Sequence, residues 1–376
     1  MICLSIGGLS CNGKKQRIDS GSGNNMVDSA LVQYAHGFTI KKDGNVTLLM
    51  VSNPWQGAQG VKYHYVLCPK GERIPEKYAH YPVIYTPVER VICLATTHIA
   101  MLSALGKTSS IKALSGPAFV SDSAVVRAIS DGRIIDIGYD QALNFERIIA
   151  LKPDVIFAYG VGHEILGSLT RLTDLGLNVV LNAEYLERTA LGKAEWLKFM
   201  AGFYNCGALA DSLFDSIQEE YNRLRELAGS VQQKPTVMCG LPWQGSWYIP
   251  GGRTTTANMI ADAGGNYLWK HNDSHESYPI NIEAIIEKGS VADLWIDTGS
   301  AKSLNEIKSV DERLVYTQPW KTGKVYNNYA RMSAGGGNDF FESGVVQPHL
   351  ILKDLIKIFH PDLLPGHQLY YYIKLN

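Results

Sequence analysis

The stretch Ala208–Ala228, which reads ALADSLFDSIQEEYNRLRELA, decides the fold. Its apolar residues recur at steps of three and four, which places them on one face of a helix, with charged residues on the other face. Glu219 and Arg223 are four residues apart, a spacing that predicts a weakly stabilising pair. Gly229 follows the stretch where a C′ glycine belongs, so we expect a single helix of roughly 30 Å. Taken alone, this is an ordinary amphipathic helix, and its importance comes from the segments on either side.

Two similar segments flank this helix. The first, Asn144–Ile149, reads NFERII and is followed by an apolar run that opens at Asp154. The second, Asn281–Ile286, reads NIEAII and is followed by an apolar run that opens at Asp293. Convergent helix capping is one explanation, because Asn is a good N-cap and Glu suits a first helical turn. The shared order of the elements favours an internal repeat, and hence two related lobes joined by one long helix.

Short apolar runs alternate with helical patterns on both sides of the long helix. VICLA, IKALSG, DVIFAYG and NVVLN are expected strands before it, and TVMCG, DLWID and VYNNYA are expected strands after it. This alternation is typical of parallel α/β sheets. The expected fold class is therefore α/β, with two Rossmann-like lobes of parallel sheet joined by a single interlobe helix. Thr254 is a candidate N-cap for the helical run TTTANMIADAG.

A β-rich segment precedes the first lobe. FTIKK, VTLLMVSN and KYHYVLC read as strands, and Asp43-Gly44 is a hairpin signal between the first two. We expect an N-terminal β appendage laid against the first lobe. The predicted organisation is a signal and linker at 1–25, the appendage at 26–87, the first lobe at 88–190, a helical connector at 191–230 and the second lobe at 231–376.

The run RVICLATTHIAMLSALG followed by LNFERIIALKPDVIFAYG resembles the substrate-binding proteins of ABC importers for iron-siderophores, haem and vitamin B12. The second part is similar to the family's N-L-E-x-I-x-x-L-x-P-D-x-V segment almost residue for residue. The resemblance runs from about Val88 to Pro365. It implies that a ligand binds between the lobes and that an ABC permease is the partner. The appendage is not part of the general family, but it resembles an extension found in gut-bacterial relatives.

Ligand-binding candidates lie after the expected strands, because open α/β sheets bind ligands beyond the carboxyl ends of their strands. Aromatic and polar side chains are concentrated there, and they suit a large planar or aryl-bearing chelate. Arg331 suits carboxylate or catecholate oxygens of such a ligand. For each single residue, ordinary packing remains an alternative. The candidates are Thr97, His98, Phe119, Tyr159, His163, Trp243, Trp247, Tyr329 and Arg331, with Tyr139 and Tyr248 nearby.

The resemblance also assigns a role to the repeated glutamates. In the family, one glutamate per lobe docks onto arginines at the mouth of the permease. Glu146 matches that position closely, and Glu283 matches it through INIEAII alone. A carboxylate on an exposed first turn suits a charge-assisted pair with arginine, and two of them on separate lobes fix the orientation of docking.

The first residues, MICLSIGGLSCNGKKQRIDSGSGNN, resemble the end of a bacterial lipoprotein signal. A short apolar run leads to Cys11, and a polar linker follows it. Gly8 stands where a large aliphatic residue is usual, and no basic n-region precedes the run; a disordered N-terminus is the alternative. We expect Cys11 to be lipidated and the chain to be a monomer in the periplasm, attached to a bacterial membrane only through this anchor.

Other classes of function have weaker support. The chain has 376 residues, 35 basic and 36 acidic, so nothing indicates a nucleic-acid-binding face, and no apolar run spans a bilayer. Gly106-Lys107-Thr108 lacks the preceding glycine of a P-loop, and no Gly-x-Ser-x-Gly motif occurs. His271 and His275 have a metal-like spacing but lie in a polar, loop-like run. Gly251-Gly252-Arg253 precedes a helix and suits an anion, although a tight turn is the simpler explanation.

We therefore expect a binding protein, not an enzyme, that holds no catalytic residues, metal site or cofactor. Its ligand is expected to be a ferric siderophore, haem or cobalamin, and the sequence does not choose among these. Nitrogenase-type metalloproteins reuse a bilobal α/β scaffold, but the scattered cysteines here do not suit metal clusters. A lipid-anchored binding protein without a transport role is a third possibility.

Overall fold

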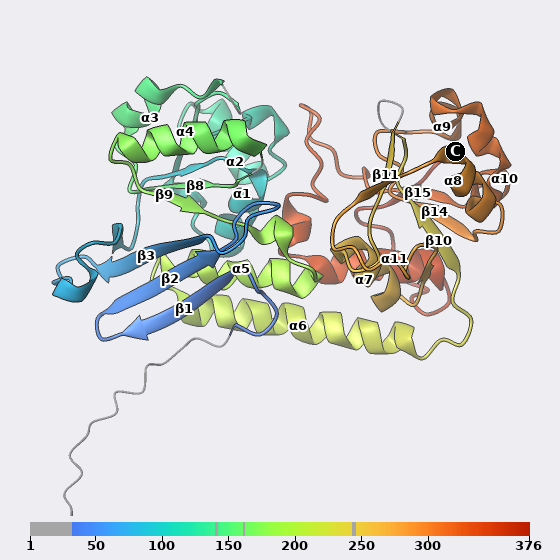
Figure 1. Cartoon of the computed structure of the whole chain (residues 1–376), viewed down its shortest axis with the longest axis horizontal. Helices are drawn as coiled ribbons and strands as arrows, with labels where there is room; N and C mark the ends of the chain where they lie inside the picture. The colour runs from blue at the N-terminus through green and yellow to red at the C-terminus, as the bar shows by residue number, and fades with distance from the viewer. Residues whose placement is uncertain (1–31, 140–141, 161, 243–245) are drawn as a thin grey trace, which may run out of the picture.

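The computed structural model describes residues 32–139, 142–160, 162–242 and 246–376, and for residues 162–165 it describes the backbone alone. Two α/β lobes lie side by side above one long helix, α6, and a β-sheet packs against the first lobe (Figure 1). The fold class expected from the sequence is confirmed. Cys11 and Trp243 lie outside the described residues, as does the side chain of His163. In the described part, no helix combines the length and apolar character needed to cross a bilayer.

The first lobe is built on a five-stranded, fully parallel sheet in the order β7-β6-β5-β8-β9. Its strands are short, and all except the edge strand β7 are mostly buried, as expected for a parallel sheet covered on both faces. The elements are β5 (Val91–Cys93), α1 (Thr96–Ala104), β6 (Ile111–Leu114), α2 (Ser123–Ser130), β7 (Ile135–Asp136), α3 (Phe145–Leu151), β8 (Val155–Ala158), α4 (Gly162–Asp174) and β9 (Val179–Leu181).

The second lobe has a five-stranded sheet in the order β12-β10-β14-β15-β16, parallel except for its last strand, and a two-stranded sheet of β11 and β13. Pro348 is the first residue of α11, where a proline loses no helical hydrogen bond. The sequence pattern placed Val345, Val346 and Gln347 in this helix, but they precede it, and Val345 ends a short 3-10 helix, Ser343–Val345. The elements are β10 (Thr236–Cys239), β11 (Trp247–Ile249), α7 (Thr255–Asp262), β12 (Asn266–Tyr267), β13 (Tyr278–Ile280), α8 (Ile282–Gly289), β14 (Leu294–Ile296), α9 (Leu304–Val310), α10 (Gln318–Thr322), β15 (Val325–Asn327), α11 (Pro348–Phe359) and β16 (Ile373–Lys374).

Helix α6 (Gly207–Gly229) extends one residue beyond the predicted stretch at each end. Its buried positions include Ala210, which belongs to the core of the first lobe, and Phe214 and Leu224, which belong to the core of the second. Two local predictions are wrong. Arg223 pairs with Glu220, three residues away, rather than with Glu219. Gly229 is the last helical residue rather than a C′ glycine, and Ser230 is the C-cap.

The appendage is a four-stranded sheet in the order β1-β2-β3-β4, formed by Phe38–Asp43, Val46–Ser52, Lys62–Pro69 and Val83–Thr86. The predicted hairpin at Asp43-Gly44 joins β1 to β2, and Gly44 supplies a φ of 63°. Phe38 of β1 contacts the ring of Trp196 at a centroid distance of 4.7 Å. Trp196 lies in helix α5 (Ala190–Gly202), so the appendage shares its core with the first lobe.

Two buried carboxylates of the first lobe hold the segment that leads into β1. Glu195 accepts hydrogen bonds from the backbone N–H groups of three consecutive residues, Gln33, Tyr34 and Ala35, at 2.7–3.1 Å. Glu187 accepts hydrogen bonds from the N–H groups of His36 and Gly37 and from the Trp196 indole. Because a buried carboxylate is stable only when its oxygens are paired, these bonds fix the start of the appendage.

Candidate functional site

Residues that follow strands of both lobes line a common cavity of about 270 Å³, which we call the inner cavity. Thr97 follows β5, and Glu184 and Tyr185 follow β9. Thr255 and Thr256 begin helix α7 of the second lobe, with Thr254 as the N-cap predicted from the sequence. The remaining lining residues are Ala190, Lys193, Met259, Phe340, Phe341, Gly344, Val345, Pro348 and Ile351.

A buried acid and a partly buried amine lie at this cavity. Glu184 is 5% exposed, and its Oε2 atom has no hydrogen-bond partner among the described residues. Burial raises the pKa of Glu184, and the Thr97 hydroxyl opposes this rise. Burial lowers the pKa of Lys193, and the carboxylates of Glu184 and Glu187 oppose this fall. An unpaired polar atom in a buried position is costly, so Glu184 offers a hydrogen-bonding site to a molecule that enters the cavity.

A side cavity of about 700 Å³ shares Tyr185, Lys193, Thr255 and Thr256 with the inner cavity. Tyr248 of the second lobe is 55% exposed and also lines it. Together, the two cavities form a cleft between the lobes, which combines aromatic rings with hydroxyl, amine and carboxyl groups.

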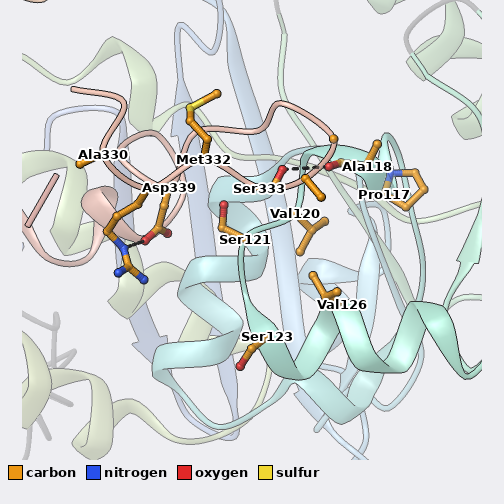
Figure 2. A pocket seen from close by; sticks show the side chains of 13 residues that line it. Pro117, Ala118, Val120, Ser121, Ser123, Val126, Ala330, Met332, Ser333 and Asp339 are labelled. Atoms are coloured by element: carbon orange, nitrogen blue, oxygen red, sulfur yellow. Dashed lines mark hydrogen bonds and ion pairs between the residues drawn. The ribbon is translucent and has the colours of Figure 1, made fainter. Parts of the chain in front are cut away.

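A loop of the second lobe, residues 330–339, crosses to the first lobe and borders an open cavity of about 770 Å³, which we call the front cavity (Figure 2). The Ser333 hydroxyl donates a hydrogen bond to the Ala118 carbonyl at 3.0 Å. Gly335 and Gly337 have no room for a Cβ atom, because the backbone oxygens of Ala118 and Phe119 occupy that space. The loop therefore packs too closely for any residue but glycine at these two positions.

Glu342 adds further hydrogen bonds between the two lobes, beside those of the crossing loop. Its two carboxyl oxygens accept hydrogen bonds from the backbone N–H groups of Ser121 and Asp122, each at 2.8 Å. The side chain is buried, and desolvation raises its pKa to about 7, with further increases from the carboxylates of Asp339 and Asp122. Glu342 therefore changes its charge near neutral pH while it bridges the two lobes.

Residues 91–327 match the family described as periplasmic binding protein. The chain belongs to the periplasmic binding protein family. Two uncharacterized lipoproteins of Methanocaldococcus jannaschii are similar to it. One is 27% identical over 304 residues, 79% of this chain and 71% of that protein. The other is 25% identical over 311 residues, 78% of this chain and 75% of that protein.

Solved structures share the fold at low identity. A possible iron-binding, periplasmic solute-binding protein from Staphylococcus epidermidis has a TM-score of 0.58 at 18% identity, covering 73% of this chain and 99% of that one. A periplasmic haem-binding protein from Pseudomonas aeruginosa has a TM-score of 0.56 at 17% identity. The match covers 73% of this chain and 93% of that one. A periplasmic vitamin B12-binding protein from Vibrio cholerae has a TM-score of 0.52 at 15% identity. The match covers 72% of this chain and 96% of that one. Periplasmic binding proteins bind solutes and are not enzymes, as expected from the sequence.

Two predicted ligand-binding residues of this periplasmic binding protein are buried in the lobes, and we correct them. His98 is fully buried in α1, next to Thr97, and its ring lies 6.1 Å from that of Phe157. Burial lowers the pKa of His98 to about 3, so the ring is neutral. Trp247 is 2% exposed and stacks on Trp295 at 5.9 Å. Side chains alternate along a strand, so the next residue, Tyr248, faces the cleft in its place.

The other predicted residues with described side chains lie in different settings, and among them Arg331 lines the front cavity. Its Nε atom pairs with Asp339 at 2.7 Å. Phe119 is 43% exposed, beside the ring of Tyr139 at 5.6 Å. Tyr159 is partly buried against the core of the first lobe. The Tyr329 hydroxyl donates a hydrogen bond to the Lys302 carbonyl. Among the predicted residues whose side chains the structure describes, only Thr97 lines the inner cavity.

The sequence analysis missed Glu184, Tyr185 and Lys193. Glu184 and Tyr185 follow β9, so the rule applied to the other strand ends would have found them. Lys193 lies one turn inside helix α5, and nothing in the local sequence separates it from a surface lysine.

Metal-binding alternatives have no structural support. Within residues 32–139, 142–160, 162–242 and 246–376, no group of three or more His, Cys, Asp or Glu side chains able to hold a metal ion is found among those the structure describes. His271 and His275 lie in an exposed loop rather than on a helix, as the surface-turn interpretation predicts.

The repeated glutamates occupy equivalent, exposed positions. Asn144 caps α3 by accepting a hydrogen bond from the Arg147 N–H group, and Asn281 caps α8 through the Ala284 N–H group. Glu146 and Glu283 each stand in the first turn that follows. Both helices lie on the side of their lobe away from α6 (Figure 1). Helix capping therefore explains the two asparagines. It does not explain the two glutamates, whose carboxylates are exposed at the surface.

We predict that Glu342 makes the unfolding free energy depend on pH. The folded state binds the Glu342 proton more tightly than the unfolded chain, so this contribution falls as the pH rises from about 4.5 to about 7 and is constant above that. The fall should be about 3 kcal/mol at most. Denaturant titrations between pH 4 and 8 should show a flatter pH dependence in Glu342→Gln.

The exposed Glu312 provides a matched control, and Glu312→Gln should retain the wild-type pH dependence. Identical pH dependence in wild type and Glu342→Gln would contradict the assignment of this charge change to Glu342.

Proposed function

We propose that this periplasmic binding protein captures an iron-siderophore or a similar metal chelate in the interlobe cleft and delivers it to an ABC importer. The observation that carries the proposal is the inner cavity between the two lobes, which is lined by Lys193 and by Glu184, whose buried Oε2 atom has no hydrogen-bond partner among the described residues. Cavities that combine apolar walls with a few polar groups are typical of small-molecule sites.

The lining favours a chelate over a small apolar solute. Tyr185 and Tyr248 provide aromatic surface, whereas Lys193, Glu184 and Thr97 provide charge and hydrogen bonds. Siderophores, haem and cobalamin all combine a bulky, partly planar body with polar groups at the edge. Cobalamin or haem are therefore the alternative ligands, and proteins of similar fold are named for binding them.

Fluorescence titrations with ferric siderophores, haemin and cyanocobalamin test this proposal. Wild-type protein should bind one of these classes with quenching of tryptophan emission. Tyr248→Ala should weaken that binding about fivefold, since one aromatic contact contributes on the order of 1 kcal/mol. Tyr316 is 59% exposed in the same lobe and lines none of the three cavities, so Tyr316→Ala should leave affinity unchanged. Absence of binding to every class would contradict the proposal.

We also propose that Glu146 and Glu283 dock onto arginines of the permease. Glu146 is exposed, and the Glu283 side chain is 70% exposed, as permease contact requires. Glu283 pairs with Arg313 at 2.8 Å, but an exposed pair of this kind contributes little to stability and exchanges partners readily.

Charge reversal tests the docking proposal. Glu146→Arg and Glu283→Arg should each reduce association with the permease and uptake, because an attractive contact becomes repulsive, and the loss should be largest at low ionic strength. Ligand affinity should not change. Glu287 is exposed on the same helix as Glu283, so Glu287→Arg is the matched control. If both reversed variants support normal uptake, the docking role is wrong; if uptake is absent in the wild type too, the chain binds its ligand without a transport role.

The proposed location is the periplasmic side of a membrane, with Cys11 as the lipid anchor. Support comes from the family and from the two relatives, which are named lipoproteins. Fatty-acid labelling that persists in Cys11→Ala protein would exclude this anchor.

A further inference from the structure

The loop between β2 and β3, residues 53–61, projects from the appendage toward the second lobe (Figure 1), and residues of it line the side cavity. It is closed by its own hydrogen bonds, from the Asn53 N–H group to the Val61 carbonyl at 2.8 Å and from the Val61 N–H group to Asn53 Oδ1 at 3.1 Å. Asn53, Gly57 and Gly60 have φ angles of 48°, 79° and 70°, which allow its sharp turns. The loop therefore presents a defined surface.

This loop docks on the strand ends of the first lobe. Gly160 lies two residues after β8, and a Cβ atom there would meet the Pro54 carbonyl at 3.2 Å and the Trp55 ring at 3.3 Å. The Tyr185 hydroxyl donates to the Gly160 carbonyl at 2.6 Å, and the Gln56 backbone amide bonds to the same hydroxyl. Thus the loop is fixed at the edge where open α/β sheets bind ligands.

Three parts of the chain meet around the side cavity. The appendage contributes the loop, the first lobe contributes the segment around Tyr185 and Lys193, and the second lobe contributes Tyr248 and the start of α7. The family match begins at residue 91, so the loop lies outside the family's two-lobed unit. The loop residues that line the cavity are Asn53, Trp55, Gln56, Gly57 and Ala58.

We propose that the β2–β3 loop is a third wall of the ligand cleft and selects the chelate through contacts of Trp55 and Gln56. This inference rests on the proposed function. Trp55 is partly exposed and presents an aromatic surface, whereas Gln56 is exposed and presents an amide. The chelate that fits has an apolar or planar body against Trp55 and a carboxylate or phosphate group that reaches Lys193, beside the first N–H groups of α7.

Trp55 also supports the loop, because it packs against the lobe core and contacts Tyr63 edge-on at 6.2 Å. Its replacement would therefore mix structural and binding effects. Gln56 avoids this difficulty, because it is an exposed residue of the cavity lining and its bond to Tyr185 comes from the backbone amide, which a substitution retains. Gln59 is an exposed glutamine of the same loop that does not line the cavity, and it provides the control.

The test compares Gln56→Trp and Gln59→Trp with wild type, with ferric siderophores, haemin and cyanocobalamin as the probes and circular dichroism melting as the check on folding. A large side chain at position 56 fills part of the cavity, so the probe that wild type binds should lose about tenfold or more in affinity. Gln59→Trp should bind within about twofold of wild type, since surface substitutions away from a site have small effects. Both variants should melt as wild type does.

Two outcomes overturn the inference and are distinguishable. If wild type binds a probe and Gln56→Trp binds it equally well, the loop is not a wall of the site and the proposed function stands. If wild type binds none of the probes, the proposed function fails and this inference fails with it.

Discussion

The burial of one face of helix α6 in the cores of both lobes is the constraint on which the rest of the structure depends. Ala210 near its start belongs to the first core, and Phe214, Tyr221, Leu224 and Ala228 belong to the second. Because these side chains are close-packed, neither lobe can rotate about α6 without exposing apolar surface. The strand ends of the two lobes, and the cavities between them, are thereby held in a fixed relation.

A second constraint comes from the loop of the second lobe that contacts the first lobe. The loop that carries Ser333, Gly335 and Glu342 leaves the second lobe and bonds to the first. Helix α6 and this loop connect the two lobes at different places, and together they resist hinging of the lobes more than α6 would alone. The cleft is then largely preformed, and binding energy is not spent on bringing the lobes together. Glu146 and Glu283, which we propose dock onto the permease, also keep a fixed separation under this arrangement.

The elements with strong local signals were predictable from the sequence. The apolar period identified α6, and the Asn-x-Glu segments identified the starts of α3 and α8, because capping depends on neighbouring residues alone. The cleft lining was predicted less well. His98 and Trp247 occupy the correct elements, but adjacent side chains on a helix or strand point in different directions, and only packing decides which faces the cleft. Lys193 and the β2–β3 loop reach the cleft through contacts between segments far apart in sequence, which a single sequence does not encode locally.

The most direct test of this account is the interlobe distance distribution in the ligand-free protein. Spin labels attached through genetically encoded keto residues at the exposed positions Ala150 of α3 and Glu287 of α8 report on both lobes without involving the cysteines. Double electron–electron resonance should give one narrow peak that barely shifts when a bound chelate is present. A broad or two-peaked distribution, or a large shift toward shorter distances with ligand, would contradict the claim that α6 and the crossing loop hold the cleft preformed.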